Sequence, residues 1–80
     1  MRSNKLLTFE MNKDKDEIQI HSNKEGLHDL IKYLESIVRI NPPTHDHFMT
    51  PSWSGIELTE GKQDSENILI NKVTVYLWDC

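Results

Sequence analysis

Two histidines, His45 and His47, are the residues best spaced to share a chemical task. On a strand, residues at i and i+2 line one face, so both imidazoles would point to the same side. Two imidazoles supply half of a tetrahedral zinc site, and two further ligands are needed. His21 and Cys80 could complete it only if the sheet order brings them close. Because no full ligand set is visible, we expect no metal and interpret the pair as polar strand residues.

Nucleophilic chemistry is also poorly supported. Cys80 stands at the end of the sequence, where chains usually fray, and a catalytic thiol needs a positioned base. Asp14 and Asp16 form a carboxylate pair, but the polar stretch around them offers no apolar pocket to separate their pKa values. The three glycines are scattered, so there is no phosphate-binding loop. We therefore expect neither an enzyme nor a cofactor.

Length and charge narrow the class of protein further. Eighty residues form one domain over 1–80, and 13 acidic against 9 basic side chains give a net charge of −4. An acidic chain lacks the basic patch typical of nucleic-acid binders. The apolar runs of the sequence are far shorter than a membrane span requires. A single cysteine suits a reducing compartment, so we expect a cytoplasmic location.

The first elements are a predicted hairpin and a helix. Apolar residues alternate over 7–11 and again over 18–20, with a polar connection between them, which predicts two antiparallel strands. Ser22 and Glu25 match a capping box at the start of a helix over residues 23–40. Six apolar side chains at helical spacing predict its core-facing stripe: Leu27, Leu30, Ile31, Leu34, Ile37 and Val38.

The second half of the chain adds two predicted strands. Residues 44–50 indicate a strand, 51–55 a turn, 57–66 an acidic loop, and 73–78 a strongly alternating strand. One amphipathic helix needs a sheet to cover its stripe. The expected fold is therefore α+β with two layers, one four-stranded, mainly antiparallel sheet packed on a single helix, in the order β-β-α-β-β.

Alternation predicts an unusual outward sheet face. If Val73, Val75 and Leu77 point at the helix, Tyr76 and Trp78 must point away from it. His45 and His47 share that outward face if Phe48 is inward, and so do Glu17, Gln19 and His21 on the second strand. Aromatic side chains mixed with polar ones are typical of an interface with a partner.

Trp53 and the acidic loop each allow two interpretations. Trp53, between Pro51 and Gly55, is either a core plug that folds the turn onto the sheet or an exposed anchor. We favour the plug, because large aromatic side chains are more often partly buried. The carboxylates of the loop, Glu57 and Glu60 among them, either belong to a solvated loop or attract a basic partner.

A family resemblance covers most of the chain from residue 6. The stretch His47–Glu60, with its Met-Thr-Pro-Ser-Trp run, resembles the signature of the thirty-second numbered immunity-protein family of bacterial polymorphic toxin systems. The segments 18–34 and 70–78 are also similar to it, although Ser54 stands where the pattern has a glycine. The resemblance implies a cytosolic protein that binds and neutralises a cognate toxin.

The expected partner is therefore a toxin protein, without nucleic acid or membrane. The candidate partner-binding residues are His45, His47, Trp53, Glu57, Glu60, Tyr76 and Trp78. The alternative is a homodimer, or a small-ligand-binding module, that uses the open sheet face as its interface.

Overall fold

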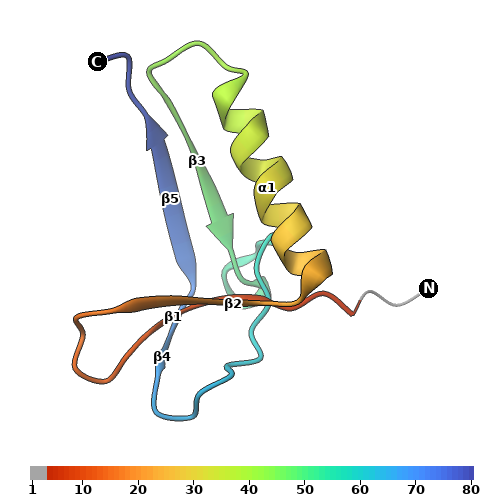
Figure 1. Ribbon diagram of the computed structural model, residues 1–80, viewed down its shortest axis with the longest axis vertical. Helices are drawn as coiled ribbons and strands as arrows, with labels where there is room; N and C mark the ends of the chain where they lie inside the picture. Colours follow the sequence, from red (N-terminus) through yellow and green to blue (C-terminus); the bar gives the residue numbers. More distant parts are fainter. Residues whose placement is uncertain (1–3) are drawn as a thin grey trace.

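The computed structural model describes residues 4–80 of the chain, and two groups of elements make up the fold. Strands β1, β2 and β4 lie across one end of the molecule, and α1, β3 and β5 rise from it side by side (Figure 1). The elements are β1 (Leu7–Met11), β2 (Ile18–Ser22), α1 (Lys24–Val38), β3 (Thr44–Met49), a 3-10 turn (Pro51–Trp53), β4 (Ile68–Ile70) and β5 (Lys72–Leu77).

The strands form two antiparallel sheets, so the α+β class is confirmed and the single four-stranded sheet is wrong. One sheet has the order β2-β1-β4, and the other pairs β3 with β5. A single residue, Asn71, separates the extra strand β4 from β5. The Asn71 carbonyl accepts a hydrogen bond from the Thr50 N–H at 3.0 Å. This contact fixes the point at which the chain leaves the first sheet and enters the second.

The predicted hairpin at the start of the chain is confirmed. Strands β1 and β2 are antiparallel, with Phe9 opposite Ile20 and Met11 opposite Ile18. Asn12 closes the connection, because its side-chain Oδ1 accepts hydrogen bonds from the backbone N–H groups of residues 16 and 17 at 3.1 and 2.9 Å. An asparagine side chain that bonds the following backbone in this way is a common turn device.

Helix α1 confirms the predicted helix with slightly shorter bounds, but the capping box on Ser22 is wrong. The N-cap is Asn23, whose Oδ1 accepts hydrogen bonds from the Gly26 N–H at 2.9 Å and from the Leu6 N–H at 3.1 Å. Asn23 caps the helix and ties its start to the segment before β1, which a serine hydroxyl at position 22 does not do. No helix within residues 4–80 is long and apolar enough to span a membrane.

The core lies between α1, β1 and β3, and it uses only part of the predicted helix stripe. The buried apolar residues are Leu7, Phe9, Leu30, Ile37, Phe48 and Leu58. Of the six helix residues expected in the core, only Leu30 and Ile37 are buried. The other four, Leu27, Ile31, Leu34 and Val38, are 39–71% exposed. The expectation fails because the helix meets β3 through the side that carries Tyr33, whose ring lies 5.3 Å from the Phe48 ring.

Candidate partner-binding site

The alternation on β5 places its aromatic residues as the sequence predicts. In the β3–β5 pair, His45 is opposite Tyr76 and His47 is opposite Thr74, so these residues share one face. The opposite face of β5 carries Val73, Val75 and Leu77, which are partly buried against the core. The outward placement of Tyr76 and Trp78 is therefore confirmed, whereas their function as a binding surface stays a prediction.

Four rings on this face contact one another in a row, which we call the aromatic ladder: His47, His45, Tyr76 and Trp78. The centroids of the His45 and Tyr76 rings lie 5.3 Å apart, and those of Tyr76 and Trp78 lie 5.7 Å apart with an interplanar angle of 6°. The His47 ring meets His45 edge-on at 5.0 Å. Aromatic pairs in these geometries contribute about 0.5–1.5 kcal/mol each beyond the area they bury.

The ladder is exposed and yet ordered by its own contacts. Tyr76 is 57% and Trp78 is 63% exposed. His47 is anchored from β5, since its Nδ1 lies 3.0 Å from the Thr74 hydroxyl. Stacked rings have fewer rotamers to lose when a partner covers them, so such a surface binds at a reduced entropic cost. It offers flat apolar faces with polar edges, which suit contact with another protein.

The paired histidines lack the companions of a metal site. Among residues 4–80 no three His, Cys, Asp or Glu side chains gather at distances that would hold an ion. His21, which the sequence allows as a third ligand, lies on β2 in the other sheet and bonds Gln19 at 2.8 Å. Cys80 is exposed beyond the end of β5.

Trp53 lies at the other end of β3 from Trp78, and its interpretation as a core plug is wrong. The side chain is 53% exposed. Thr50 takes the buried place instead: its carbonyl accepts hydrogen bonds from the N–H groups of Trp53 and Gly55, both at 2.9 Å. Leu58, whose N–H donates to the Met49 carbonyl at 3.2 Å, is also buried. With those positions filled, the indole remains outside.

The departure from the family pattern at Ser54 occurs where the backbone favours glycine. Ser54 has φ 67° and ψ 21°, the left-handed region, at the end of the 3-10 turn. The next residue must be small, because a Cβ on Gly55 would clash with the Met49 carbonyl oxygen. The turn keeps its geometry with a serine at position 54, at a backbone cost that glycine avoids.

Glu57 and Glu60 are attached to the backbone of the same turn. A Glu57 oxygen accepts a hydrogen bond from the Met49 N–H at 3.0 Å, and Glu60 accepts one from the Ser52 N–H. The hydrogen bonds from Ser52 also hold the pKa of Glu60 below its usual value. Both carboxylates therefore shape the turn that presents Trp53. Their attraction for a basic partner stays a prediction.

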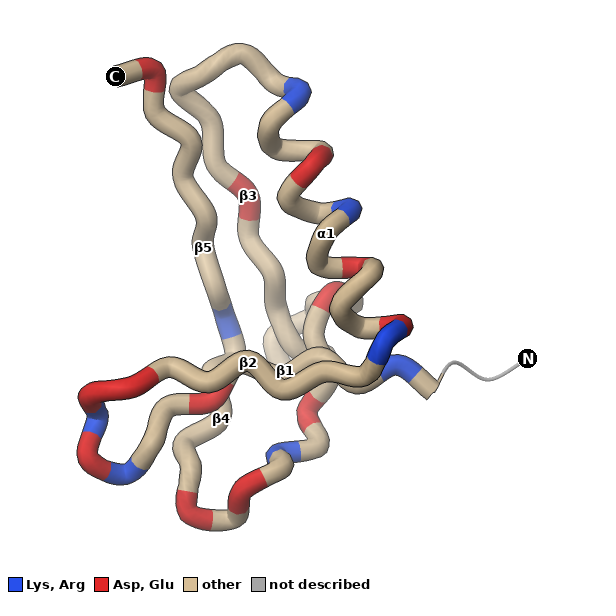
Figure 2. Tube along the Cα trace, in the orientation of Figure 1, with Lys and Arg blue, Asp and Glu red and all other residues tan. Residues whose placement is uncertain are grey.

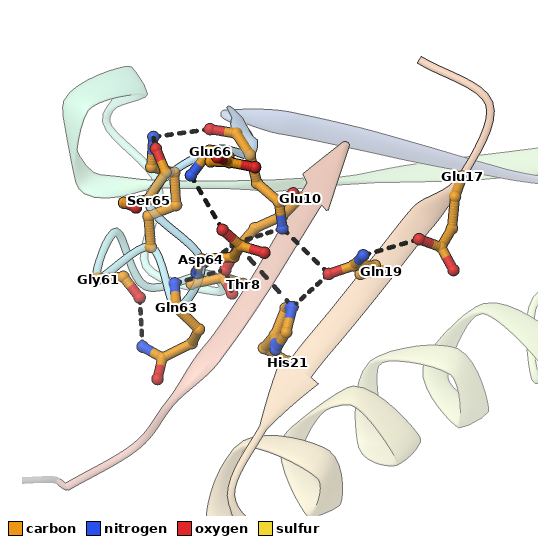
Figure 3. A network of polar contacts seen from close by, with 12 residues as sticks. Thr8, Glu10, Glu17, Gln19, His21, Gly61, Gln63, Asp64, Ser65 and Glu66 are labelled. Atoms are coloured by element: carbon orange, nitrogen blue, oxygen red, sulfur yellow. Dashed lines mark hydrogen bonds and ion pairs between the residues drawn. The ribbon is translucent and has the colours of Figure 1, made fainter. Parts of the chain in front are cut away.

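A buried carboxylate, which the sequence did not single out, holds the loop before β4 against the sheet (Figure 3). Glu10 is 0% exposed, and its carboxylate accepts four hydrogen bonds. The donors are the Thr8 hydroxyl at 2.6 Å, the backbone N–H groups of Gln63 at 2.9 Å and Asp64 at 3.3 Å, and Asn67 Nδ2 at 3.1 Å. His21 Nε2 lies 4.0 Å from one Glu10 oxygen.

This network lowers the pKa of Glu10 and holds the loop against the sheet. Burial by itself raises the pKa of Glu10, but the hydrogen bonds outweigh burial and lower the pKa to about 2. Gln19 joins the network through Asn67 Nδ2 at 3.0 Å (Figure 3). The expectation that Glu17, Gln19 and His21 share the outward face with Tyr76 is therefore wrong, because their strand belongs to the other sheet, where the loop packs on Gln19.

Charged residues concentrate away from the aromatic ladder. Figure 2 shows acidic segments around the β1–β2 connection and along the loop that leads to β4. Among Asp, Glu, Lys and Arg residues, strands β3 and β5 carry only Asp46 and Lys72. A partner on the ladder would meet aromatic rings and few charges, while the acidic loops lie at the other end of the fold.

Comparison with known proteins gives a family match. No curated protein and no solved structure matches this chain. The family model of Immunity protein 32 matches residues 17–73, which run from β2 through the helix and the Trp53 turn into β5. The match confirms the resemblance seen in the sequence: the chain belongs to the Immunity protein 32 family.

Proposed function

We propose that this protein binds a cognate bacterial toxin and neutralises it by protein–protein contact, with the aromatic ladder at the centre of the binding surface. Membership of an immunity-protein family supports a toxin as the partner. The observation that carries the location is the stack of His45, Tyr76 and Trp78, which stays exposed on the sheet face opposite the core.

Physical arguments favour the ladder as the anchor of the interface. Tryptophan and tyrosine are enriched among the residues that dominate binding energy, and truncating one commonly costs about 2 kcal/mol or more. Leaving two such rings in water gives the free protein no benefit from their apolar area, whereas a partner that covers them gains it. The function needs no reaction chemistry from this chain.

The Trp53 turn is the second contact region in this proposal, with Glu57 and Glu60 at its edge. Trp78 lies one residue beyond the Thr44–Leu77 pair, so the start of the turn at Pro51 is about 26 Å away along β3, at 3.3 Å per residue. A standard interface buries about 800 Å² on each partner, roughly 30 Å across, so one toxin surface could reach both regions. The net charge of −4 favours a basic toxin, chiefly by speeding encounter.

The test compares three variants with the unmodified protein: Trp78→Ala, Trp78→Phe and Trp53→Ala. We expect Trp78→Ala to weaken affinity for the cognate toxin at least tenfold, a loss of about 1.4 kcal/mol. The protein should stay folded, and its stability should fall by no more than the about 0.5–1.5 kcal/mol of one stacked pair. Trp78→Phe keeps a ring that stacks on Tyr76 and should lose less. Trp53→Ala should lose less affinity for the toxin than Trp78→Ala. Calorimetric titration and a melting curve on each variant give both quantities.

Two outcomes would contradict the proposal. If Trp78→Ala binds normally and Trp53→Ala does not, the centre of the interface is the turn. If all three variants bind the toxin normally, neither region is the contact surface. A tight dimer that hides Tyr76 and Trp78 would instead favour the alternative, in which the ladder is a self-association face. Measuring molar mass in solution for the unmodified protein and for Trp78→Ala separates that case.

A further inference from the structure

Helix α1 carries a second apolar face that the fold leaves uncovered. The buried side of the helix holds Leu30 and Ile37. The exposed residues Leu27, Ile31, Leu34 and Val38, here called the exposed helix stripe, are centred about 90° around the axis at 100° per residue. Ile31, Leu34 and Val38 line a shallow apolar groove with Glu35 and Arg39 at its edge.

The spacing of the exposed helix stripe is that of a helix–helix seam. Its members follow one another at intervals of four, three and four residues. This is the a/d pattern that packs one helix against another, and it is narrower than the stripe with which a helix usually covers its own core. We propose that two copies of this chain associate through the exposed helix stripe, with their α1 helices antiparallel. The inference does not depend on the proposed function.

The exposed helix stripe is open to a partner. Its four residues are 39–71% exposed, whereas Leu30 and Ile37 on the core side of the helix are 8% and 4% exposed. The helix is about 22 Å long. A pair of such helices buries less than a standard interface, so we expect a dissociation constant on the order of micromolar.

Charge and shape select the antiparallel arrangement. A two-fold axis between Ile31 and Leu34 would place Leu27 of one copy opposite Val38 of the other. The edge of the stripe that carries His28 and Glu35, here called its polar flank, then faces the same edge of the partner helix. Glu35 of one copy lies beside His28 of the other, a neutral or attractive pair. A parallel arrangement would instead press that polar flank onto the side of the partner helix that already packs into its own core.

The aromatic ladder would remain free in such a dimer. The ladder lies on the sheet face opposite the one that packs on the core, whereas the exposed helix stripe lies on the helix itself. The dimer would therefore present two copies of the ladder. If the ladder binds a toxin, a complex of two chains and two toxins follows.

Sedimentation velocity tests the association over a range up to about 1 mM, well above a micromolar dissociation constant. We expect a species of twice the 9.4 kDa chain mass that dissociates on dilution. Ile31→Glu should raise the dissociation constant at least tenfold. Val38→Glu, at the most exposed position of the stripe, should do the same if Ile31→Glu perturbs folding. The matched control is Ile56→Glu, on a loop isoleucine that is 85% exposed, which should not change association.

Orientation is tested by disulfide formation. Two variants, His28→Cys and Glu35→Cys, each in a Cys80→Ser background, should cross-link readily when mixed and poorly when kept apart. A chain that stays monomeric at about 1 mM overturns the proposal, since even weak specific dimers form there. A dimer that persists in both Ile31→Glu and Val38→Glu also overturns the proposal. A dimer that dissociates only in Trp78→Ala does the same. Equal cross-linking of each cysteine variant with itself overturns the antiparallel arrangement.

Discussion

Glu10 links the stability of this fold to pH, because a fully buried carboxylate is held ionised by four hydrogen bonds. The perturbation is Glu10→Gln, which keeps the shape of the side chain but replaces one acceptor oxygen with an amide donor. That donor would face other donors, the Gln63 and Asp64 N–H groups or Asn67 Nδ2. A buried donor left without an acceptor costs about 1–3 kcal/mol.

The stability that the ionised Glu10 contributes follows from the pKa of its carboxyl. A fall of this pKa from 4.5 to about 2 corresponds to about 3 kcal/mol of stability, at 1.36 kcal/mol per pKa unit. Because the pKa is lower in the folded state, this contribution is fully present above about pH 4.5 and is lost as the pH falls toward 2. A domain of this size has a total stability of about 4–12 kcal/mol, so the loss is a large fraction.

The assay is urea unfolding followed by circular dichroism at several pH values between 7 and 2.5. We expect Glu10→Gln to lower the free energy of unfolding by about 2–4 kcal/mol at pH 7 and to flatten its pH dependence between 4.5 and 2.5. The control is Glu66→Gln, whose exposed carboxylate only forms a surface ion pair with Lys13 at 3.6 Å; it should cost at most about 1 kcal/mol. An unchanged acid slope in Glu10→Gln would refute the reasoning.

Two further substitutions test the core and the turn. At about 0.1 μM protein, well below a micromolar dissociation constant, Leu30→Ala should cost about 2–5 kcal/mol and Leu34→Ala about 1 kcal/mol or less, since Leu30 is 8% and Leu34 is 39% exposed. Equal costs in urea unfolding at this concentration would show that the exposed stripe is covered within the monomer. Ser54→Gly should stabilise the protein by up to about 1 kcal/mol in thermal melts, because φ is 67° there, while Ser54→Ala keeps the Cβ and should not; a lower melting temperature for Ser54→Gly would contradict the backbone argument.

The elements of this fold could be predicted because their patterns are local. Alternation around Phe9 and Ile20 identified the hairpin, and alternation around Val75 identified which residues accompany Tyr76 on the outer face. Helical spacing identified α1. These inferences require only that a residue's neighbours at two, three or four positions share its face.

The predictions that failed depend on contacts between distant segments. The sequence pattern places Glu10 on the polar face of a strand, yet its side chain is buried because Asn67, 57 residues later, contacts it. The four-stranded sheet failed because alternation does not specify pairing partners, and the chain changes sheet at Asn71. The helix stripe was too wide for the core it meets: hydrophobicity marked Leu34 and Leu30 alike, and only the position of β3 separates them.

The buried side chain that holds the loop before β4 is distinct from the rings proposed to bind. Glu10 satisfies backbone N–H groups that would otherwise be unpaired, so changing it destabilises the fold. The outer rings of the ladder, Tyr76 and Trp78, stack on each other outside the core. If the ladder binds as proposed, substitutions there cost little more stability than the stacked pairs contribute, and they change which partner is recognised, because specificity is a difference in affinity between partners. The proposed binding surface can then vary without loss of the scaffold that carries it.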